Sequence, residues 1–251
     1  MRRFYVDLDI TDNNTVWLDK EESRHVIKVT RLKEGESLLV FDNAGKEFEA
    51  KIKTIEQGHK VEVEIIKEID QPKRKFELFV AQAFLQKQKL DTMIEKACEL
   101  GVQGVYPMVS EFSAARPKQV QFEKMESRWR RIITQAKKQS GNIRGVQIRP
   151  MSSFEGVINN ADEFDFKFIF HQVEPGISLS EAISHMQKQV SSVEGKCKAL
   201  VLIGAEGGFS DREVEQALEK QFAAVYLGET VLRAETAFIA ISSAIKLMVN
   251  D

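Results

Sequence analysis

The sequence predicts an α/β protein in which a parallel-sheet domain follows a small β-barrel domain. Three observations lead to this prediction. Closely spaced strand patterns fill the first part of the chain, strand and helix patterns alternate in the rest, and the polar, proline-containing residues 70–75 separate the two parts. We therefore expect a barrel domain over residues 1–70 and an α/β domain over residues 73–251.

The expected elements follow from the spacing of the apolar residues. In the first part, strands are expected over residues 15–18, 37–41, 48–55 and 61–66, with an Asn43-Ala44-Gly45 turn signal between two of them. In the second part, strands are expected over residues 76–81, 105–109, 166–170, 199–203 and 222–227. Helices are expected from Leu90 up to Gly101, over residues 122–139 and 179–190, after Ser210, and from about residue 231.

The strand at residues 199–203 is the start of the most informative segment. It is short, apolar and partly β-branched, which is typical of a strand buried on both faces of a parallel sheet. Gly204-Ala205-Glu206-Gly207-Gly208 follows it, and Ser210 with Glu213 forms a capping-box signature for a helix. The glycines therefore lie at the carboxyl end of a strand, where open α/β sheets bind ligands.

The chemistry of this loop argues against a nucleotide phosphate. The glycine spacing fits neither the dinucleotide fingerprint nor the P-loop, and the Glu206 carboxylate would repel an anion. S-adenosylmethionine, which carries a sulfonium and no phosphate, fits better. Taken alone, the Gly-Gly pair favours the alternative, a tight strand-to-helix turn that bears a solvated glutamate.

A second glycine bend follows the next strand. Residues 222–227 end at Gly228, and a helix of small residues is expected from about residue 231. Arg233 and Glu235 lie at this junction, where backbone packing alone requires no ionisable group. The alternative is an ion pair or a cap at a solvated helix end.

Together the two bends resemble a family signature. Residues 203–210, Leu227-Gly228 and residues 231–237 are similar to the C-terminal motif of the RsmE family of 16S ribosomal RNA uracil-N3 methyltransferases, within the SPOUT superfamily. The resemblance covers the whole chain, because further motifs occur upstream in the same order. These are His25-Val26, Arg31-Leu32, Glu95 to Val102, Arg128-Trp129 and Gln139-Ser140.

The chain departs from the family pattern at a few positions. Ala205 stands where the family usually has proline, Ala234 stands where it has threonine, and the residues after Gln139-Ser140 also differ. The first change frees the loop backbone and the second removes a hydroxyl from the pocket. Glu206, Arg233 and Glu235 are retained, so the implied ligand class is unchanged.

The resemblance implies a fold and a reaction. The fold is a PUA-like RNA-binding barrel followed by a SPOUT α/β domain with a C-terminal trefoil knot, assembled as a homodimer in the cytoplasm. The reaction is methylation of uracil N3 in 16S rRNA of the small ribosomal subunit, with S-adenosylmethionine as methyl donor. Two rivals stay open: a noncatalytic RNA-binding or ribosome-assembly protein, and a SPOUT methyltransferase that acts on another RNA nucleotide.

Candidate site residues follow from this reaction. Arg233 is expected to stabilise a uracilate-like transition state and Glu235 to orient it, while Glu206 is either a ligand contact or the base. His171 and Gln172 are candidate pocket-lining residues outside the catalytic set. The expected donor contacts are Leu202, Gly204, Glu206, Gly207, Gly208, Leu227, Gly228, Leu232 and Thr236.

An uneven charge distribution indicates RNA binding. The formal net charge is −2, yet residues 127–149 contain several arginines and lysines and no Asp or Glu. Apolar residues give the helix expected over residues 122–139 one buried side, so several of these cations project from its other side. There they either lie along a phosphate backbone or form an ordinary solvated helix face. The expected RNA contacts are Arg2, Arg3, Arg24, Arg31, Arg128, Arg131, Lys138 and Arg144.

Composition excludes several other classes. At 251 residues and 43% hydrophobic, the chain can bury a sizeable core. No apolar stretch resembles a signal peptide or a membrane span. Cys98 and Cys197 lie far apart, and the four histidines form no ligand-spaced pair, so we expect reduced thiols and no metal site.

Overall fold

The structure, a computed structural model, describes residues 2–11, 14–56, 59–71, 74–171 and 176–249. The chain divides into two compact units. Residues Met1–Lys73 group with Thr134–Arg144, and Arg74–Ile133 group with Gly145–Asp251. The end of the long helix α3 (Gln119–Ser140) thus belongs to the first unit, which no sequence pattern indicated. The functional domain bounds 1–70 and 73–251 stay a prediction.

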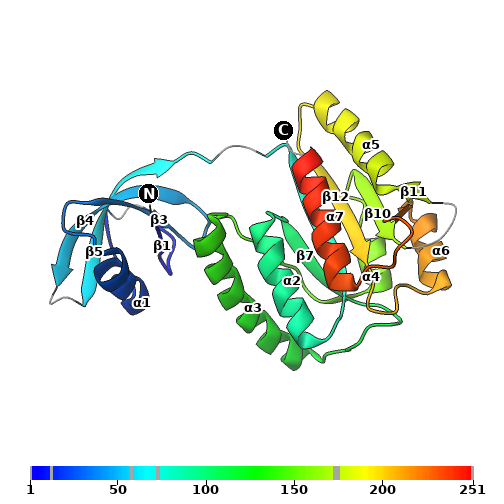
Figure 1. The fold of residues 1–251 in the computed structure, drawn as a ribbon, viewed down its shortest axis with the longest axis horizontal. Coiled ribbons are helices and arrows are strands. Elements are labelled where there is room, and N and C mark those ends of the chain that lie inside the picture. Colours follow the sequence, from blue (N-terminus) through cyan, green and yellow to red (C-terminus); the bar gives the residue numbers. More distant parts are fainter. Residues whose placement is uncertain (1, 12–13, 57–58, 72–73, 172–175, 250–251) are drawn as a thin grey trace. The chain divides into compact units, whose positions relative to one another are not determined.

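The first unit is built on a curved sheet (Figure 1). Within the described residues this sheet has five strands in the order β1-β3-β4-β5-β2. The strands are β1 (Arg3–Tyr5), β2 (Thr15–Trp17), β3 (Ser37–Phe41), β4 (Glu47–Glu56) and β5 (Lys60–Ile69). The pairing of β1 with β3 is parallel and the others are antiparallel. In the part of the chain that is described, no pairing joins β1 to β2, so hydrogen bonding leaves the predicted barrel open there.

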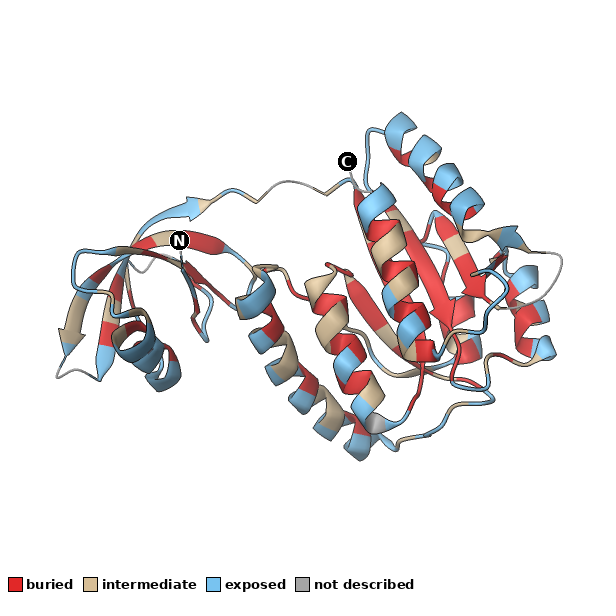
Figure 2. Ribbon diagram, in the orientation of Figure 1, coloured by how far each residue is buried: buried red, intermediate tan, exposed pale blue. Residues whose placement is uncertain are grey.

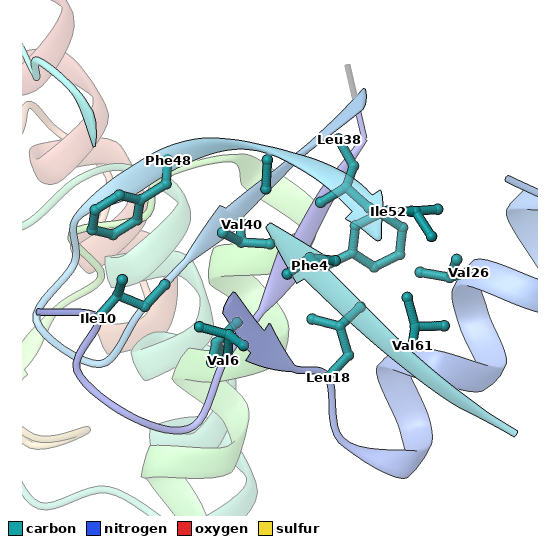
Figure 3. Close-up of a cluster of buried hydrophobic side chains, with 13 residues drawn as sticks. Phe4, Val6, Ile10, Leu18, Val26, Leu38, Val40, Phe48, Ile52 and Val61 are labelled. Carbon is teal, nitrogen blue, oxygen red and sulfur yellow. The ribbon is translucent and has the colours of Figure 1, made fainter. Parts of the chain in front are cut away.

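Apolar side chains from all five strands fill the concave side of this sheet. Figure 3 shows Phe4, Val40, Ile52 and Val61 pointing toward one another, and all are almost fully buried. A short helix, α1 (Lys20–Arg24), and a π-helical segment, η1 (His25–Thr30), add Val26 to this core. β1, α1 and η1 were not predicted, because each is too short to show a clear hydrophobic period.

An ion pair lies in the interior of the first unit. The Lys138 ammonium contacts the Glu22 carboxylate, whose side chain is 2% exposed, and also lies over the Tyr5 ring. Burial raises the pKa of Glu22, although the hydrogen bond from Lys138 opposes this effect. Burial also raises the pKa of Tyr5 to about 12. The end of α3 is therefore held by a desolvated charge pair and an aromatic contact.

The second unit contains the predicted parallel sheet. Within the described residues it has eight strands, and every pairing is parallel. The order is β11-β13-β10-β12-β6-β7-β8, with β9 beside β7. The strands are β6 (Phe76–Ala83), β7 (Gly104–Val109), β8 (Gln147–Ile148), β9 (Ser152–Ser153), β10 (Phe166–Phe170), β11 (Ile177–Ser178), β12 (Cys197–Ile203) and β13 (Ala223–Tyr226). Figure 2 shows the central strands as almost continuously buried, which confirms the predicted α/β class.

Helices flank this sheet (Figure 1). Besides α3 they are α2 (Lys87–Glu99), α4 (Phe154–Asn159), α5 (Leu179–Ser192), α6 (Asp211–Glu219) and α7 (Ala234–Val249). Ser210 and Glu213 form the predicted capping box of α6. Helix α7 contacts α2 and α5 and packs on β6 and β12. It begins at Ala234 and not near residue 231, so Arg233 precedes its first turn.

Candidate active site

A pocket of about 280 Å³ lies where β10, β12 and β13 end. These three strands are adjacent in the sheet and parallel, so their carboxyl ends meet at one edge. The lining residues are Phe170, His171, Ile203, Gly204, Ala205, Glu206, Gly207, Gly208, Val225, Leu227, Thr230, Val231, Leu232, Ala234 and Ala237. The sheet edge that the sequence predicts as a ligand site is thus hollowed.

The glycine loop after β12 folds back on itself. The Gly208 N–H donates to the Ala205 carbonyl at 3.0 Å, which closes a tight turn. A Cβ on Gly204 would lie 2.7 Å from the Gly208 carbonyl carbon, and Gly208 has a φ of +74°. Glycine is required at both positions, for close approach at the first and for a left-handed backbone at the second. The buried Gln82 amide donates to the Gly204 carbonyl at 3.0 Å and fixes the loop to β6.

Three charged side chains meet beside the pocket. The Lys89 ammonium of α2 lies 2.8 Å from a Glu206 carboxylate oxygen and 3.6 Å from one of Glu235. These residues come from α2, from the loop after β12 and from the first turn of α7. The group therefore joins three segments that are far apart in the sequence.

The pKa values of Glu206 and Lys89 are shifted by their contact, and the shift bears on whether Glu206 acts as a base or as a ligand contact. Partial burial opposes ionisation of Glu206, but the hydrogen bond from Lys89 and backbone N–H groups outweigh it and lower the Glu206 pKa. The hydrogen bond to Glu206 correspondingly raises the pKa of Lys89. A carboxylate with a lowered pKa is a poor proton acceptor at neutral pH, so ligand contact is the better-supported role of Glu206. Lys89 was not predicted, because no sequence motif marks it.

Arg233 is exposed and stands in the segment between β13 and α7. Among the described residues, the ion pairs of Glu206 and Glu235 are with Lys89, and none joins either glutamate to Arg233. The predicted orienting contact from Glu235 to Arg233 is therefore not formed in this structure. Both sequence neighbours of Arg233, Leu232 and Ala234, line the pocket.

Most of the predicted donor contacts come together. Gly204, Glu206, Gly207, Gly208, Leu227 and Leu232 line the pocket. Leu202 is buried inside β12, Thr236 is exposed on α7, and Gly228, with a φ of +110°, follows Leu227 without being part of the lining. Successive strand side chains point to opposite faces of the sheet, so Leu202 and the pocket-lining Ile203 face opposite sides.

His171 also lines the pocket, as expected. Burial lowers its pKa, and the Asp211 carboxylate opposes this only in part, so its imidazole is neutral at neutral pH. Gln172 lies outside the described residues. The other lining residues were not predicted, because small or apolar residues at strand and helix ends carry no distinctive signal. They are Phe170, Ile203, Ala205, Val225, Thr230, Val231, Ala234 and Ala237.

The predicted RNA-contacting cations differ in exposure and in whether an acidic side chain is paired with them. Arg2, Arg24, Arg31 and Arg131 are exposed. Arg3 pairs with Glu47 at 2.6 Å, Arg128 pairs with Asp91 at 2.6 Å, and Lys138 is held by the buried Glu22. Arg144 is half-buried. The exposed set is therefore the better candidate for phosphate contacts.

Neither a membrane-spanning helix nor a metal-binding cluster occurs in the described residues. No helix there is long and apolar enough to cross a membrane. No cluster of three or more His, Cys, Asp or Glu side chains suited to a metal ion occurs in that part of the chain.

Comparisons with known proteins agree with this geometry. A curated relative from Buchnera aphidicola (Acyrthosiphon pisum strain), named ribosomal RNA small subunit methyltransferase E, is 28% identical, with 99% of this chain and 94% of that protein covered. A Neisseria gonorrhoeae enzyme of the same name, solved bound to S-adenosyl methionine, superposes with a TM-score of 0.79 at 26% identity over 100% of this chain and 99% of that one. A probable rRNA-methyltransferase from Porphyromonas gingivalis superposes with a TM-score of 0.81 at 28% identity, over 99% of this chain and 98% of that one.

Family models match both parts of the chain. Residues 18–66 match an RNA methyltransferase PUA domain, which confirms the PUA-type character of the first part. Residues 72–246 match the RNA methyltransferase domain model, which is most of the chain. The resemblance to the RsmE family is confirmed, and the chain belongs to the RNA methyltransferase domain family.

Proposed function

We propose that this protein methylates N3 of a uridine in 16S ribosomal RNA, with S-adenosylmethionine as the methyl donor. The observation that carries the proposal is the glycine-walled pocket with the ionised Glu206 on its wall, in a chain of the RNA methyltransferase family. The related Neisseria protein, named ribosomal RNA small subunit methyltransferase E, is bound to S-adenosyl methionine and supports the choice of donor.

The pocket residues suit a neutral purine next to a cationic group. Gly204, Gly207 and Gly208 leave backbone N–H and C=O groups accessible for hydrogen bonds to adenine and ribose. Glu206 supplies the negative charge that a donor cation requires. When bound, S-adenosylmethionine supplies a methyl group on a positively charged sulfur. The role of these residues is to hold that methyl group in line with the incoming base.

Arg233 is the proposed catalytic cation. Uracil N3 carries a proton and becomes a nucleophile only when that proton leaves to a base, which shifts negative charge onto the neighbouring oxygens. N3 then forms the bond to the methyl carbon, while the sulfur–carbon electron pair stays on sulfur. Arg233 is proposed to donate hydrogen bonds to the uracil oxygens in this transition state. Glu235 is proposed to act through Lys89, which it contacts, in positioning the pocket walls.

The assembly expected from the resemblance is part of the proposal. We propose a PUA-like RNA-binding domain over residues 1–70, a SPOUT domain over residues 73–251 with a C-terminal trefoil knot, and a homodimer that acts on small-subunit RNA in the cytoplasm. Exposed apolar residues on α7, Ile239, Leu247 and Met248, support a protein contact there. Light scattering of the purified chain tests the dimer.

Replacement of Arg233 by alanine tests the catalytic assignment. The Arg233→Ala variant should lose about 10²- to 10³-fold in kcat, the range seen on loss of one transition-state donor. Its calorimetric affinity for S-adenosylmethionine should stay close to that of the wild type. Unchanged methylation of small subunits would overturn the role of Arg233, and absence of donor binding by the wild type would favour the noncatalytic rival.

A further inference from the structure

Phe112 is an exposed aromatic ring at the same sheet edge as the pocket. It follows β7, whose partner β6 is also the partner of β12, so its loop and the glycine loop leave the sheet on either side of β6. The ring is 46% exposed. A Cβ built on Gly207 would lie 3.1 Å from the Phe112 Cβ and 3.4 Å from its Cγ. Phe112 therefore borders the pocket wall at Gly207.

The loop that carries Phe112 is fastened on both sides of the ring. The Ser110 N–H donates to the Ser113 hydroxyl at 2.8 Å, and the Ala114 N–H donates to the Phe84 carbonyl at 2.9 Å. The Glu111 N–H donates at 2.9 Å to the buried Glu213, the same carboxylate that caps α6 after the glycine loop. One glutamate thus ties the Phe112 loop to the pocket wall. The half-exposed Phe112 ring is thus carried by a loop whose backbone is hydrogen-bonded on both sides, which is how a contact residue is positioned for a ligand.

A basic groove continues from this loop. It has a volume of about 370 Å³, and three of its lining residues are the cations Arg116, Lys124 and Arg128. Arg116 donates to the Glu111 carbonyl at 3.0 Å, so the groove begins beside the Phe112 turn. A single RNA strand carries phosphates that suit such a groove and bases that stack on aromatic rings.

We propose that Phe112 is the platform on which the target base stacks when it leaves the RNA helix for methylation, with Arg116 and Lys124 of this groove holding flanking phosphates. The inference rests on the proposed function and adds a substrate-positioning residue to it. Enzymes that act on a base must take it out of its stack, and an aromatic surface beside the reacting group compensates for the lost stacking. The ring at Gly207 stands next to the methyl-donor pocket, where such a surface is required.

Four variants test the platform. Phe112→Tyr keeps the ring, Phe112→Leu keeps an apolar contact with Gly207 without a ring, Phe112→Ala removes both, and Leu218→Ala is a control that removes an equally exposed apolar residue from α6. The ring-free variants should raise KM for small ribosomal subunits, or lower affinity for them, by about 5- to 150-fold. Phe112→Tyr and Leu218→Ala should stay within about twofold of the wild type, and calorimetric affinity for S-adenosylmethionine should change in none of them.

The readouts separate this inference from the proposed function. If nucleoside analysis finds a methylated base other than uracil, the uracil assignment fails, while the same variants on that base still decide the platform. If the wild type methylates no base, the affinities of the wild type and the four variants for small ribosomal subunits decide whether Phe112 is the platform. Full activity of Phe112→Leu would overturn the proposal. So would a Phe112→Ala variant that loses affinity for S-adenosylmethionine together with affinity for RNA, or one whose oligomeric state differs from that of the wild type.

Discussion

Two groups of lysine and glutamate side chains, one in each unit, differ in burial and in charge balance. In the first unit Glu22 and Lys138 pair one to one, with side chains 2% and 19% exposed. In the second unit Lys89 serves both Glu206 and Glu235, and all three side chains are between 24% and 36% exposed. Two carboxylates share one ammonium there, so one negative charge is in excess beside the pocket.

This difference indicates different roles for the same residue types. A buried charge that loses its partner stays desolvated, which destabilises the fold strongly. A half-exposed charge that loses its partner is solvated by water, so its loss changes stability little. The excess negative charge beside the pocket is instead available to a cationic ligand. We infer that the fold requires both members of the Glu22 pair, because either charge alone would stay buried, and that the Lys89 group serves ligand binding.

The largest expected effect is on stability. Lys138→Met should lower the free energy of unfolding by about 3–5 kcal/mol, because it leaves Glu22 buried without a partner. Lys89→Met, the matched control in the pocket group, should change the free energy of unfolding far less, because the charges it leaves behind are solvated. Urea unfolding of both variants at neutral pH measures the difference. An equal loss of unfolding free energy in Lys138→Met and Lys89→Met would contradict the inference that the two charged groups have different roles.

The next effect is on donor binding. Glu206→Gln should weaken S-adenosylmethionine binding by about 10- to 100-fold, because a charge-assisted hydrogen bond contributes about 1.5–3 kcal/mol. The control Glu215→Gln changes an exposed carboxylate on α6 that is not part of the pocket lining. Calorimetry measures both affinities. An unchanged affinity of Glu206→Gln would exclude a ligand role for the excess charge.

The smallest effect is a pH dependence of stability in the first unit. Because the folded-state pKa of Glu22 is raised, the folded chain binds the Glu22 proton more tightly than the unfolded chain. This contribution is fully present below the unfolded pKa and is lost as pH rises through the folded pKa. Relative to Glu22→Gln, the wild type should therefore become more stable as pH falls through that window. Urea unfolding at stepped acid pH measures the slope, and a slope of opposite sign would show that the hydrogen bond from Lys138 outweighs the burial of Glu22.

The sequence predicts the α/β unit better than the first unit, and the reason is physical. Strand 199–203 and the Ser210 capping box were predicted because buried parallel strands are continuous apolar runs and helix caps are local signals. The strand at Arg3–Tyr5 and the helical residues 20–30 are stabilised by packing on the barrel core, which sequence spacing does not report.

The candidate site shows the same limit. Glu206 and the glycines of its loop were predicted because consecutive residues in the sequence determine the chemistry of a loop. Lys89 and Phe112 were not, since each reaches the site only through the order of the strands in the sheet. Lys138 was predicted to bind RNA, yet its ammonium is occupied by a glutamate more than a hundred residues away in the chain.

The central claim is that this protein places one methyl group on uracil N3 of small-subunit ribosomal RNA. Nucleoside analysis of 16S rRNA from cells with and without the protein tests it most directly. Loss of 3-methyluridine alone, restored by the wild type and not by Arg233→Ala, is the predicted result. Undiminished 3-methyluridine in cells that lack the protein would contradict the claim.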